Sequence, residues 1–143
     1  MMSSAKIWLP VFALLIISGL TGCDRSAAMN ESTANVKHIT QGEFASQVTS
    51  AGGAVVVDFY ATWCGPCRAL APMVEKAAGA FSAKVKFFKV NIDESPGLAQ
   101  NFQVEAIPTL LFFKDGQLKN RITGLPAEAE LTAKLEALVA AGK

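Results

Sequence analysis

The sequence predicts one α/β domain in which helices flank a central mixed β-sheet, with the element order βαβαβαββα. The nearly continuous apolar, β-branched run at residues 54–60 has the composition of a strand that is buried on both faces, and residues 85–91 predict another strand. Helical patterns alternate with these strands, and such alternation gives a largely parallel sheet with helices on both sides. Near the end, Asp115-Gly116 predicts a hairpin that adds antiparallel strands. A chain of 143 residues has room for one such core.

The first half of the domain begins with a short strand at residues 36–39. Thr40 and Glu43 then have the spacing of a capping box, which predicts a helix after the strand. The buried strand at 54–60 follows, and residues 64–81 have helical periodicity. Pro72 lies inside this pattern, so we expect it to kink the helix.

The second half follows the strand at residues 85–91. Residues 95–102 predict a short helix that is entered through Ser95-Pro96, and strands at 109–114 and 118–123 flank the hairpin turn. Pro126 is suited to the first turn of a last helix, which we expect to reach about residue 140.

The N-terminus has the pattern of a secretion signal. Residues 7–20, after Lys6, carry no charge, and this run is shorter than the roughly 18–20 residues that span a bilayer. Leu20-Thr21-Gly22-Cys23 resembles the lipobox of bacterial lipoproteins, in which the cysteine receives a diacylglycerol, the signal is cleaved before it and the new amine is acylated. The resemblance implies a signal peptide at 1–22 and a lipid on Cys23. The alternatives are an ordinary signal peptide or an uncleaved anchor.

Residues 23–35 are expected to be the lipidated cysteine and a flexible tether, because they are small, polar and without periodicity. As a random coil this segment reaches on the order of 20 Å. Asp24 resembles the inner-membrane retention signal of enterobacterial lipoproteins. We therefore expect a domain at 36–143 that is lipid-anchored to the bacterial cytoplasmic (inner) membrane and faces the periplasm or cell exterior.

The charge and cysteine counts argue against several other classes. There are 13 Lys and Arg and 12 Asp and Glu residues, and this balance does not favour nucleic-acid binding. Three cysteines are too few for a disulfide-framework scaffold, and with the single His38 they form no convincing metal site. We expect no metal, no dissociable cofactor, a solvent-facing His38 and, by default, a monomer.

Trp63-Cys64-Gly65-Pro66-Cys67 lies between a buried strand and the start of a helix. Cysteines three residues apart in a first helical turn come within disulfide range. The helix N-terminus stabilises a thiolate on Cys64, which attacks disulfides, and Cys67 is placed to resolve the mixed disulfide. The alternatives are a structural disulfide, half of a metal site, or two unreactive core thiols.

Residues 36–140 resemble thioredoxin over their whole length. The matching stretches are Val57 to Cys67 (VDFYATWCGPC), Ala71-Pro72, Val90 to Asp93 (VNID), Ile107 to Leu110 (IPTL), Asp115-Gly116 and Gly124. The resemblance implies the thioredoxin fold, a redox-active Cys64–Cys67 disulfide and thiol–disulfide exchange with protein substrates.

The family pattern also assigns roles to two charged residues. Asp58 stands at the place of the buried acid beneath the cysteine pair, where it would accept the proton of Cys67, and burial would raise its pKa. Lys89 matches a lysine close to that acid and is a candidate modulator. From the sequence alone, Asp58 could equally reach water at the end of its strand, and Lys89 could be an ordinary solvated lysine.

The resemblance further implies a substrate-binding groove beside the cysteines. Ile107-Pro108 matches the family's cis-proline loop, although an X–Pro bond taken alone favours trans. The remaining groove residues are Trp63, Gly65, Pro66 and Gly124, and Trp63 has simple packing as its alternative.

Together these features predict a membrane-tethered thiol–disulfide oxidoreductase that reduces disulfides of extracytoplasmic proteins. Gly65-Pro66 favours a reductant, because strongly oxidising relatives carry other dipeptides. A reductant outside the cytoplasm needs electrons from a membrane thiol carrier. The alternatives are an oxidant or isomerase of the same disulfides, and a thioredoxin-fold binding subunit whose thiols are incidental.

Overall fold

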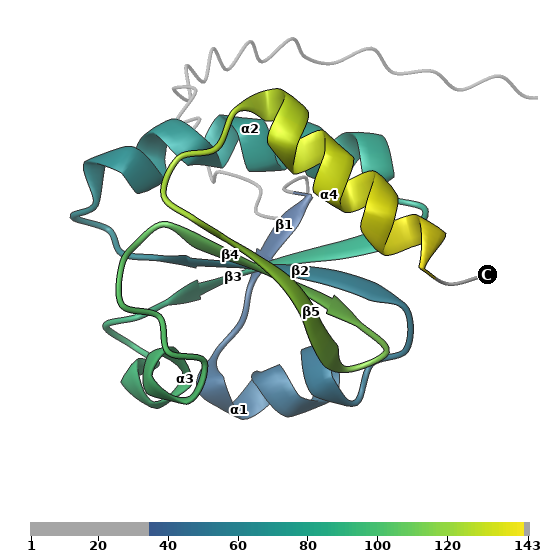
Figure 1. The fold of residues 1–143 in the computed structure, drawn as a ribbon. Coiled ribbons are helices and arrows are strands. Elements are labelled where there is room, and N and C mark those ends of the chain that lie inside the picture. Colours follow the sequence, from purple (N-terminus) through teal and green to yellow (C-terminus); the bar gives the residue numbers. More distant parts are fainter. Residues whose placement is uncertain (1–34, 142–143) are drawn as a thin grey trace, which may run out of the picture. The chain divides into compact units, whose positions relative to one another are not determined.

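The computed structural model describes residues 35–141. The predicted signal peptide, Cys23 and all of the tether before Asn35 lie outside the described residues. The elements follow the chain as β1 (Val36–His38), α1 (Gln41–Phe44), the π-helical turn η2 (Ala45–Thr49), β2 (Ala54–Tyr60), α2 (Gly65–Phe81), β3 (Val85–Asn91), α3 (Pro96–Asn101), β4 (Thr109–Lys114), β5 (Gln117–Thr123) and α4 (Glu128–Ala140) (Figure 1).

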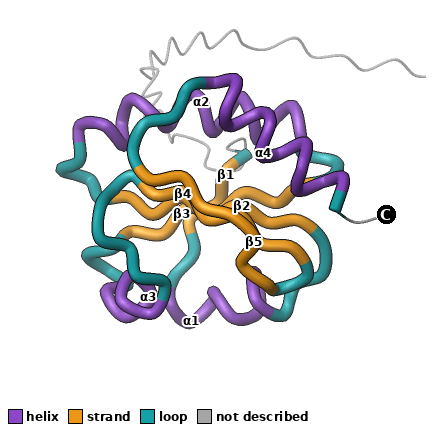
Figure 2. Tube along the Cα trace, in the orientation of Figure 1, coloured by secondary structure: helices purple, strands orange, loops and turns teal. Residues whose placement is uncertain are grey.

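The five strands form one mixed sheet in the order β1-β3-β2-β4-β5. β1, β3 and β2 are parallel, whereas β4 and β5 are antiparallel to their neighbours. The sheet is a single layer with helices on either side of it (Figure 2). The predicted order of elements and the mixed sheet are therefore confirmed.

Two apolar cores lie on opposite faces of the sheet. Val56 of β2 packs with residues of α2 and α4, and its neighbours Val55 and Val57 pack with α1, η2 and α3. Figure 1 shows α2 and α4 on one side and α1 and α3 on the other. Because successive side chains of a strand point to opposite faces, a strand covered on both sides is apolar along most of its length. This explains the apolar run at 54–60, in which Asp58 is the one charged residue.

The boundaries differ from the sequence prediction mainly at the ends of helices. The last helix begins at Glu128, because Ala127 is still extended, with φ −70° and ψ 148°. Glu43 accepts hydrogen bonds from the backbone and hydroxyl of Thr40 at 2.9 Å each, as a capping box predicts.

No helix among residues 35–141 is long and apolar enough to cross a membrane.

The turn between β4 and β5 is the predicted two-residue hairpin. Asp115 and Gly116 both have positive φ, 49° and 77°, as such a turn requires. The Asp115 carboxylate accepts a hydrogen bond of 2.7 Å from the N–H of Gly53. This contact joins the hairpin to the loop that precedes β2.

Candidate active site

The cysteine pair lies just beyond the carboxyl end of β2. The strand ends at Tyr60, and Cys64 is the N-cap residue of α2. Cys64 and Cys67 form a disulfide with their Cα atoms 5.3 Å apart. The carboxyl ends of β1 and β3 reach the same edge, which is where open α/β sheets bind their ligands.

The first turn of α2 places a backbone N–H group against the sulfur of Cys64. The backbone N–H of Cys67 donates a hydrogen bond of 3.2 Å to Sγ of Cys64. Pro66 costs no hydrogen bond in this turn, because the N–H groups of the first helical turn have no partner within the helix. In the dithiol form, the N-terminus of this helix stabilises a thiolate on Cys64.

Asp58 lies beneath the pair on β2 and is only 6% exposed. It lines a cavity of about 160 Å³ together with Cys67, Lys89 and Tyr60. Its Oδ1 atom is buried and has no hydrogen-bond partner within the described part of the chain. Burial raises the pKa of Asp58 to about 7, while the positive charge of Lys89 opposes this shift. The structure thus brings the predicted acid, its lysine and Cys67 to one cavity.

Tyr60 and His38 form part of the same region, which the sequence did not indicate. The Lys89 ammonium lies 6.0 Å from the centre of the Tyr60 ring, and the His38 ring meets that ring edge-on at 6.4 Å. Nε2 of His38 is 3.5 Å from a carboxylate oxygen of Glu94. The side chain of His38 is 33% exposed. It reaches solvent, as expected, over part of its surface, and Tyr60 packs against another part.

The Ile107–Pro108 peptide bond is cis, the isomer that the family resemblance implied. The carbonyl oxygen of Pro108 accepts a hydrogen bond of 2.8 Å from the N–H of Gly124. Ile107 packs against the small apolar cluster that contains both cysteines. These contacts bring the two predicted groove segments together beside the disulfide.

Trp63 is 66% exposed, so packing in the core does not explain it. Its indole Nε1 donates a hydrogen bond of 2.9 Å to the carboxylate of Asp93. Leu125, which follows Gly124, is another large apolar side chain with a high exposure, 54%. The sequence reasoning quoted Asp93 within a family motif but missed its role in holding Trp63. No sequence pattern distinguished Leu125.

No group of three His, Cys, Asp or Glu residues that could hold a metal ion occurs within residues 35–141.

Comparisons with known proteins agree with this geometry. A family model described as Thioredoxin matches residues 35–137. The chain belongs to the thioredoxin family. It is 43% identical over 110 residues to thioredoxins of Mycobacterium bovis and Mycobacterium tuberculosis, and the match covers 77% of this chain and 94% of each relative. A thioredoxin of Staphylococcus epidermidis is 39% identical over 98 residues, which is 68% of this chain and 92% of that protein. A chloroplastic M-type thioredoxin of Spinacia oleracea is 37% identical over 114 residues, which is 80% of this chain and 61% of that protein.

The predicted family and fold are thereby confirmed. The thioredoxin domain, with the Cys64–Cys67 pair at disulfide distance, is that of a thiol–disulfide oxidoreductase, specifically a protein-disulfide reductase.

Proposed function

We propose that this thioredoxin-family chain is a lipid-anchored reductant of protein disulfides on the outer side of the bacterial cytoplasmic membrane. The apolar run and the lipobox-like Leu20-Thr21-Gly22-Cys23 support the anchor. Gly65-Pro66 between the cysteines supports the reducing direction, because this dipeptide is typical of reducing thioredoxins. The substrates are disulfide-bonded proteins of the periplasm or cell exterior.

The observation that carries the chemistry is the cavity shared by Asp58 and Cys67. The Cys64 thiolate attacks one sulfur of the substrate disulfide, and one substrate thiolate leaves and takes a proton from solvent. The Asp58 carboxylate accepts the proton of the Cys67 thiol. The Cys67 thiolate then attacks the Cys64 sulfur of the mixed disulfide and expels the second substrate thiolate, which takes a proton from solvent, and Asp58 returns its proton to solvent. Two electrons have passed to the substrate, and the Cys64–Cys67 disulfide has formed.

Lys89 modulates this proton transfer. Its ammonium favours the carboxylate form of Asp58 and so opposes the effect of burial. The result is an acid that changes its charge near neutral pH, which suits a group that must take up and release a proton in each cycle.

The substrate docks across the surface formed by Trp63, Gly65, Pro66, Ile107, Pro108 and Gly124. Gly65 lets a partner chain approach closely, and the exposed Trp63 supplies apolar contact area. Leu125 extends this surface on the side of Gly124.

Each cycle leaves a disulfide that a dithiol donor must reduce again. Outside the cytoplasm that donor is a membrane thiol carrier. The exchange of thiols and disulfides requires no dissociable cofactor, and no nucleic acid takes part. We propose that the chain works as a monomer.

The reduction potential tests the direction of electron flow. We expect a value of about −270 mV for the pair when the protein is equilibrated with a glutathione buffer, because reducing thioredoxins lie there. A value near −120 mV, the range of strong periplasmic oxidants, would contradict the reductant.

Cysteine variants test whether the thiols carry the function. We expect Cys67→Ser to accumulate a mixed disulfide with protein substrates and Cys64→Ser to form none, as read by non-reducing gels and mass spectrometry. If the Cys64→Ser, Cys67→Ser double variant restores a deletion strain as well as the unchanged protein, the chain is a binding subunit and not an enzyme.

Mass spectrometry of the mature N-terminus tests the anchor. We expect a chain that begins at an acylated Cys23, and a Cys23→Ala variant that leaves the membrane fraction. An unmodified Cys23, or cleavage at another position, would overturn the anchor but not the thiol chemistry.

A further inference from the structure

Lysine side chains gather at the end of the sheet that lies opposite the cysteines. The strand ends meet there, because Ala54 of β2 is the register partner of both Val85 and Lys114. We call this region the lysine end and define it as Lys84, Lys86, Lys114 and Lys119 near the strand ends, together with Lys37 further along the edge strand β1. All are exposed except the half-buried Lys114.

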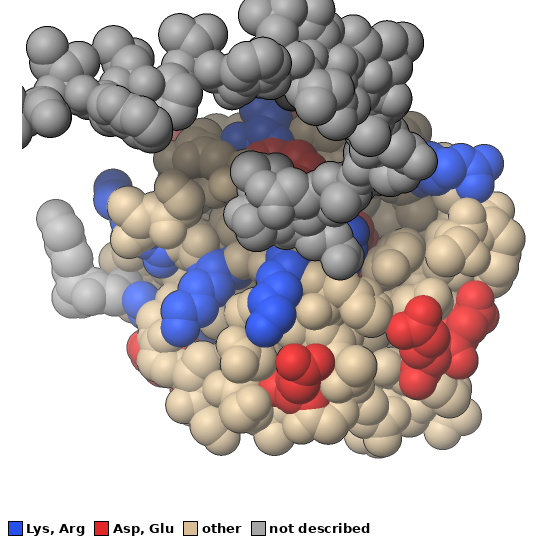
Figure 3. Space-filling view, turned by 180° about the vertical axis from the view of Figure 1, so that it is seen from behind, with Lys and Arg blue, Asp and Glu red and all other residues tan. Residues whose placement is uncertain are grey.

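Acidic side chains are fewer than lysines at this end of the sheet. Asp115 is bound to the N–H of Gly53, Glu136 lies beside Lys84, and Glu75 holds the N–H of Asn35. Around the carboxyl edge that carries the cysteines, the acids outnumber the bases: Asp58, Asp93, Glu94 and Glu105 lie there with Lys89 and Arg68. On the face shown in Figure 3, most of the visible Lys and Arg side chains lie at the left and centre, with one basic group at the upper right, and the largest acidic group lies at the right.

This separation of charge is notable because the whole chain is nearly neutral, with a formal charge of +1. A neutral protein with a positive end has little long-range attraction for anions but has a preferred orientation next to a negative surface.

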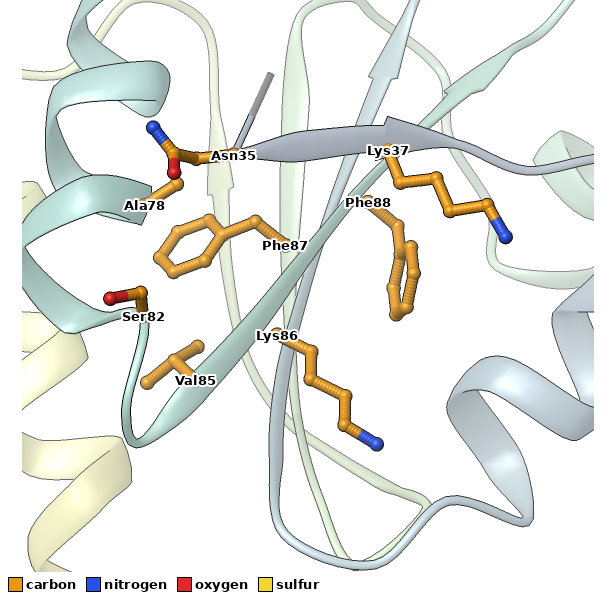
Figure 4. A pocket seen from close by; sticks show the side chains of 8 residues that line it. All are labelled: Asn35, Lys37, Ala78, Ser82, Val85, Lys86, Phe87 and Phe88. Carbon is orange, nitrogen blue, oxygen red and sulfur yellow. The ribbon is translucent and has the colours of Figure 1, made fainter. Parts of the chain in front are cut away.

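The described chain begins at the same place. Asn35 lines a groove at the β1–β3 edge together with Lys37 and Lys86. Figure 4 shows these two lysines pointing to the same side of the edge, with Phe88 between them. The backbone N–H of Asn35 is held by Glu75 of α2 at 3.1 Å, so the point where the N-terminal segment enters is fixed to the domain.

We infer that the lysine end is a docking surface for an anionic lipid bilayer. Ammonium groups on exposed lysines are attracted to anionic headgroups, and each contributes about fivefold to membrane partitioning. The N-terminal segment, which the proposed function attaches to the membrane, enters the domain beside these lysines. Docking in this way points the cysteines away from the bilayer by at least the length of β2, on the order of 20 Å.

A vesicle-binding measurement on the chain from residue 24 onward tests the surface without the lipid. The mycobacterial thioredoxins consist almost entirely of the matched domain, so this domain folds without the segment before it. We expect sedimentation with phosphatidylglycerol–phosphatidylcholine vesicles at low ionic strength, no sedimentation with pure phosphatidylcholine, and loss of binding at high salt.

Matched variants locate the surface. Lys84→Gln, Lys86→Gln removes two lysines of the lysine end, and we expect binding to fall about 25-fold. The control, Lys76→Gln, Lys134→Gln, removes the same charge from α2 and α4, at positions that pair with Glu128 and Asn120. We expect the control to bind at nearly the level of the unchanged protein.

Equal losses in both variants would show that net charge, and not this surface, controls binding, and would overturn the inference. Equal binding to neutral vesicles, or tighter binding to a single-stranded oligonucleotide, would overturn it as well. The inference rests on the proposed function in one respect, the attachment of the N-terminal segment to the membrane. Failure of the vesicle assay leaves the mass of the mature N-terminus unaffected, so the two proposals fail separately.

Discussion

Asp58 and Lys89 are register partners on the parallel strands β2 and β3, and both line the cavity that reaches Cys67. The positive charge of the lysine does not fully compensate the burial of the acid, and Oδ1 of Asp58 has no hydrogen-bond partner among residues 35–141. The pKa of Asp58 is therefore raised to about 7 from an ordinary value of 3.8. The ionisation of Asp58 should therefore affect both the free energy of unfolding of the domain and the proton transfer from Cys67.

The stability of the oxidised protein should fall as the pH rises from about 4 to about 7. In this range the unfolded chain has lost the proton of Asp58 while the folded chain still holds it, so ionisation favours unfolding. A shift of this size corresponds to on the order of 4 kcal/mol. We expect Asp58→Asn to be more stable relative to the unchanged protein at pH 8 than at pH 4, by about this amount.

Denaturant unfolding at pH 4, 6 and 8 measures this difference. Glu105→Gln is the control, because this side chain is exposed, and it should leave the pH dependence unchanged. If the difference between the Asp58→Asn variant and the unchanged protein were the same at pH 4 and pH 8, the buried acid would not titrate as described.

The resolving step should depend on the same ionisation. Asp58 can accept the Cys67 proton only as a carboxylate, so the rate of mixed-disulfide resolution should rise with pH and level off above about 7. We expect Asp58→Asn to slow this step by about 100-fold and to lose the inflection. Rapid-quench measurements of the mixed disulfide give the rate, and an unchanged inflection in the variant would assign the titration to another group.

Trp63 should affect protein substrates more than small ones. Its exposed indole offers apolar contact area, so we expect Trp63→Ala to lower kcat/KM for a protein disulfide about tenfold, mainly through KM. Reduction of a small disulfide should be nearly unchanged, and Trp63→Phe should retain more activity than Trp63→Ala. An equal loss on both substrates would indicate that the tryptophan acts on the cysteines and not on docking.

Gly116→Ala should destabilise the domain more than Gly53→Ala. Both glycines have positive φ, 77° and 89°, so each substitution strains the backbone by roughly 1–2 kcal/mol. A Cβ at Gly116 would also clash with the carbonyl oxygen of Thr49, whereas at Gly53 it meets nothing within 4 Å. We expect a further cost of about 1–3 kcal/mol at Gly116, measured by denaturant unfolding. If both variants lowered the free energy of unfolding by the same amount, the backbone of Thr49 would have to move away from the new Cβ without cost.

Most of the fold could be predicted from local patterns. The buried strands at 54–60 and 85–91, the capping box at Thr40 and the Asp115-Gly116 turn each have causes within a few residues of chain. The start of the last helix could be predicted less accurately. Pro126 suits a first helical turn, but the backbone of Ala127 is extended and the helix begins at Glu128.

The sequence by itself determined the reactive pair. Two cysteines at the N-terminus of a helix, next to a buried strand, favour thiol–disulfide chemistry through their spacing and the helix electrostatics. The tertiary structure decided which other groups act with that pair. Asp58, Lys89 and Tyr60 share a cavity with Cys67, and His38 and Asp93 hold neighbouring aromatic rings, because strand pairing brings together residues far apart in the chain. The pKa of Asp58 depends on burial from all sides, which no local pattern records.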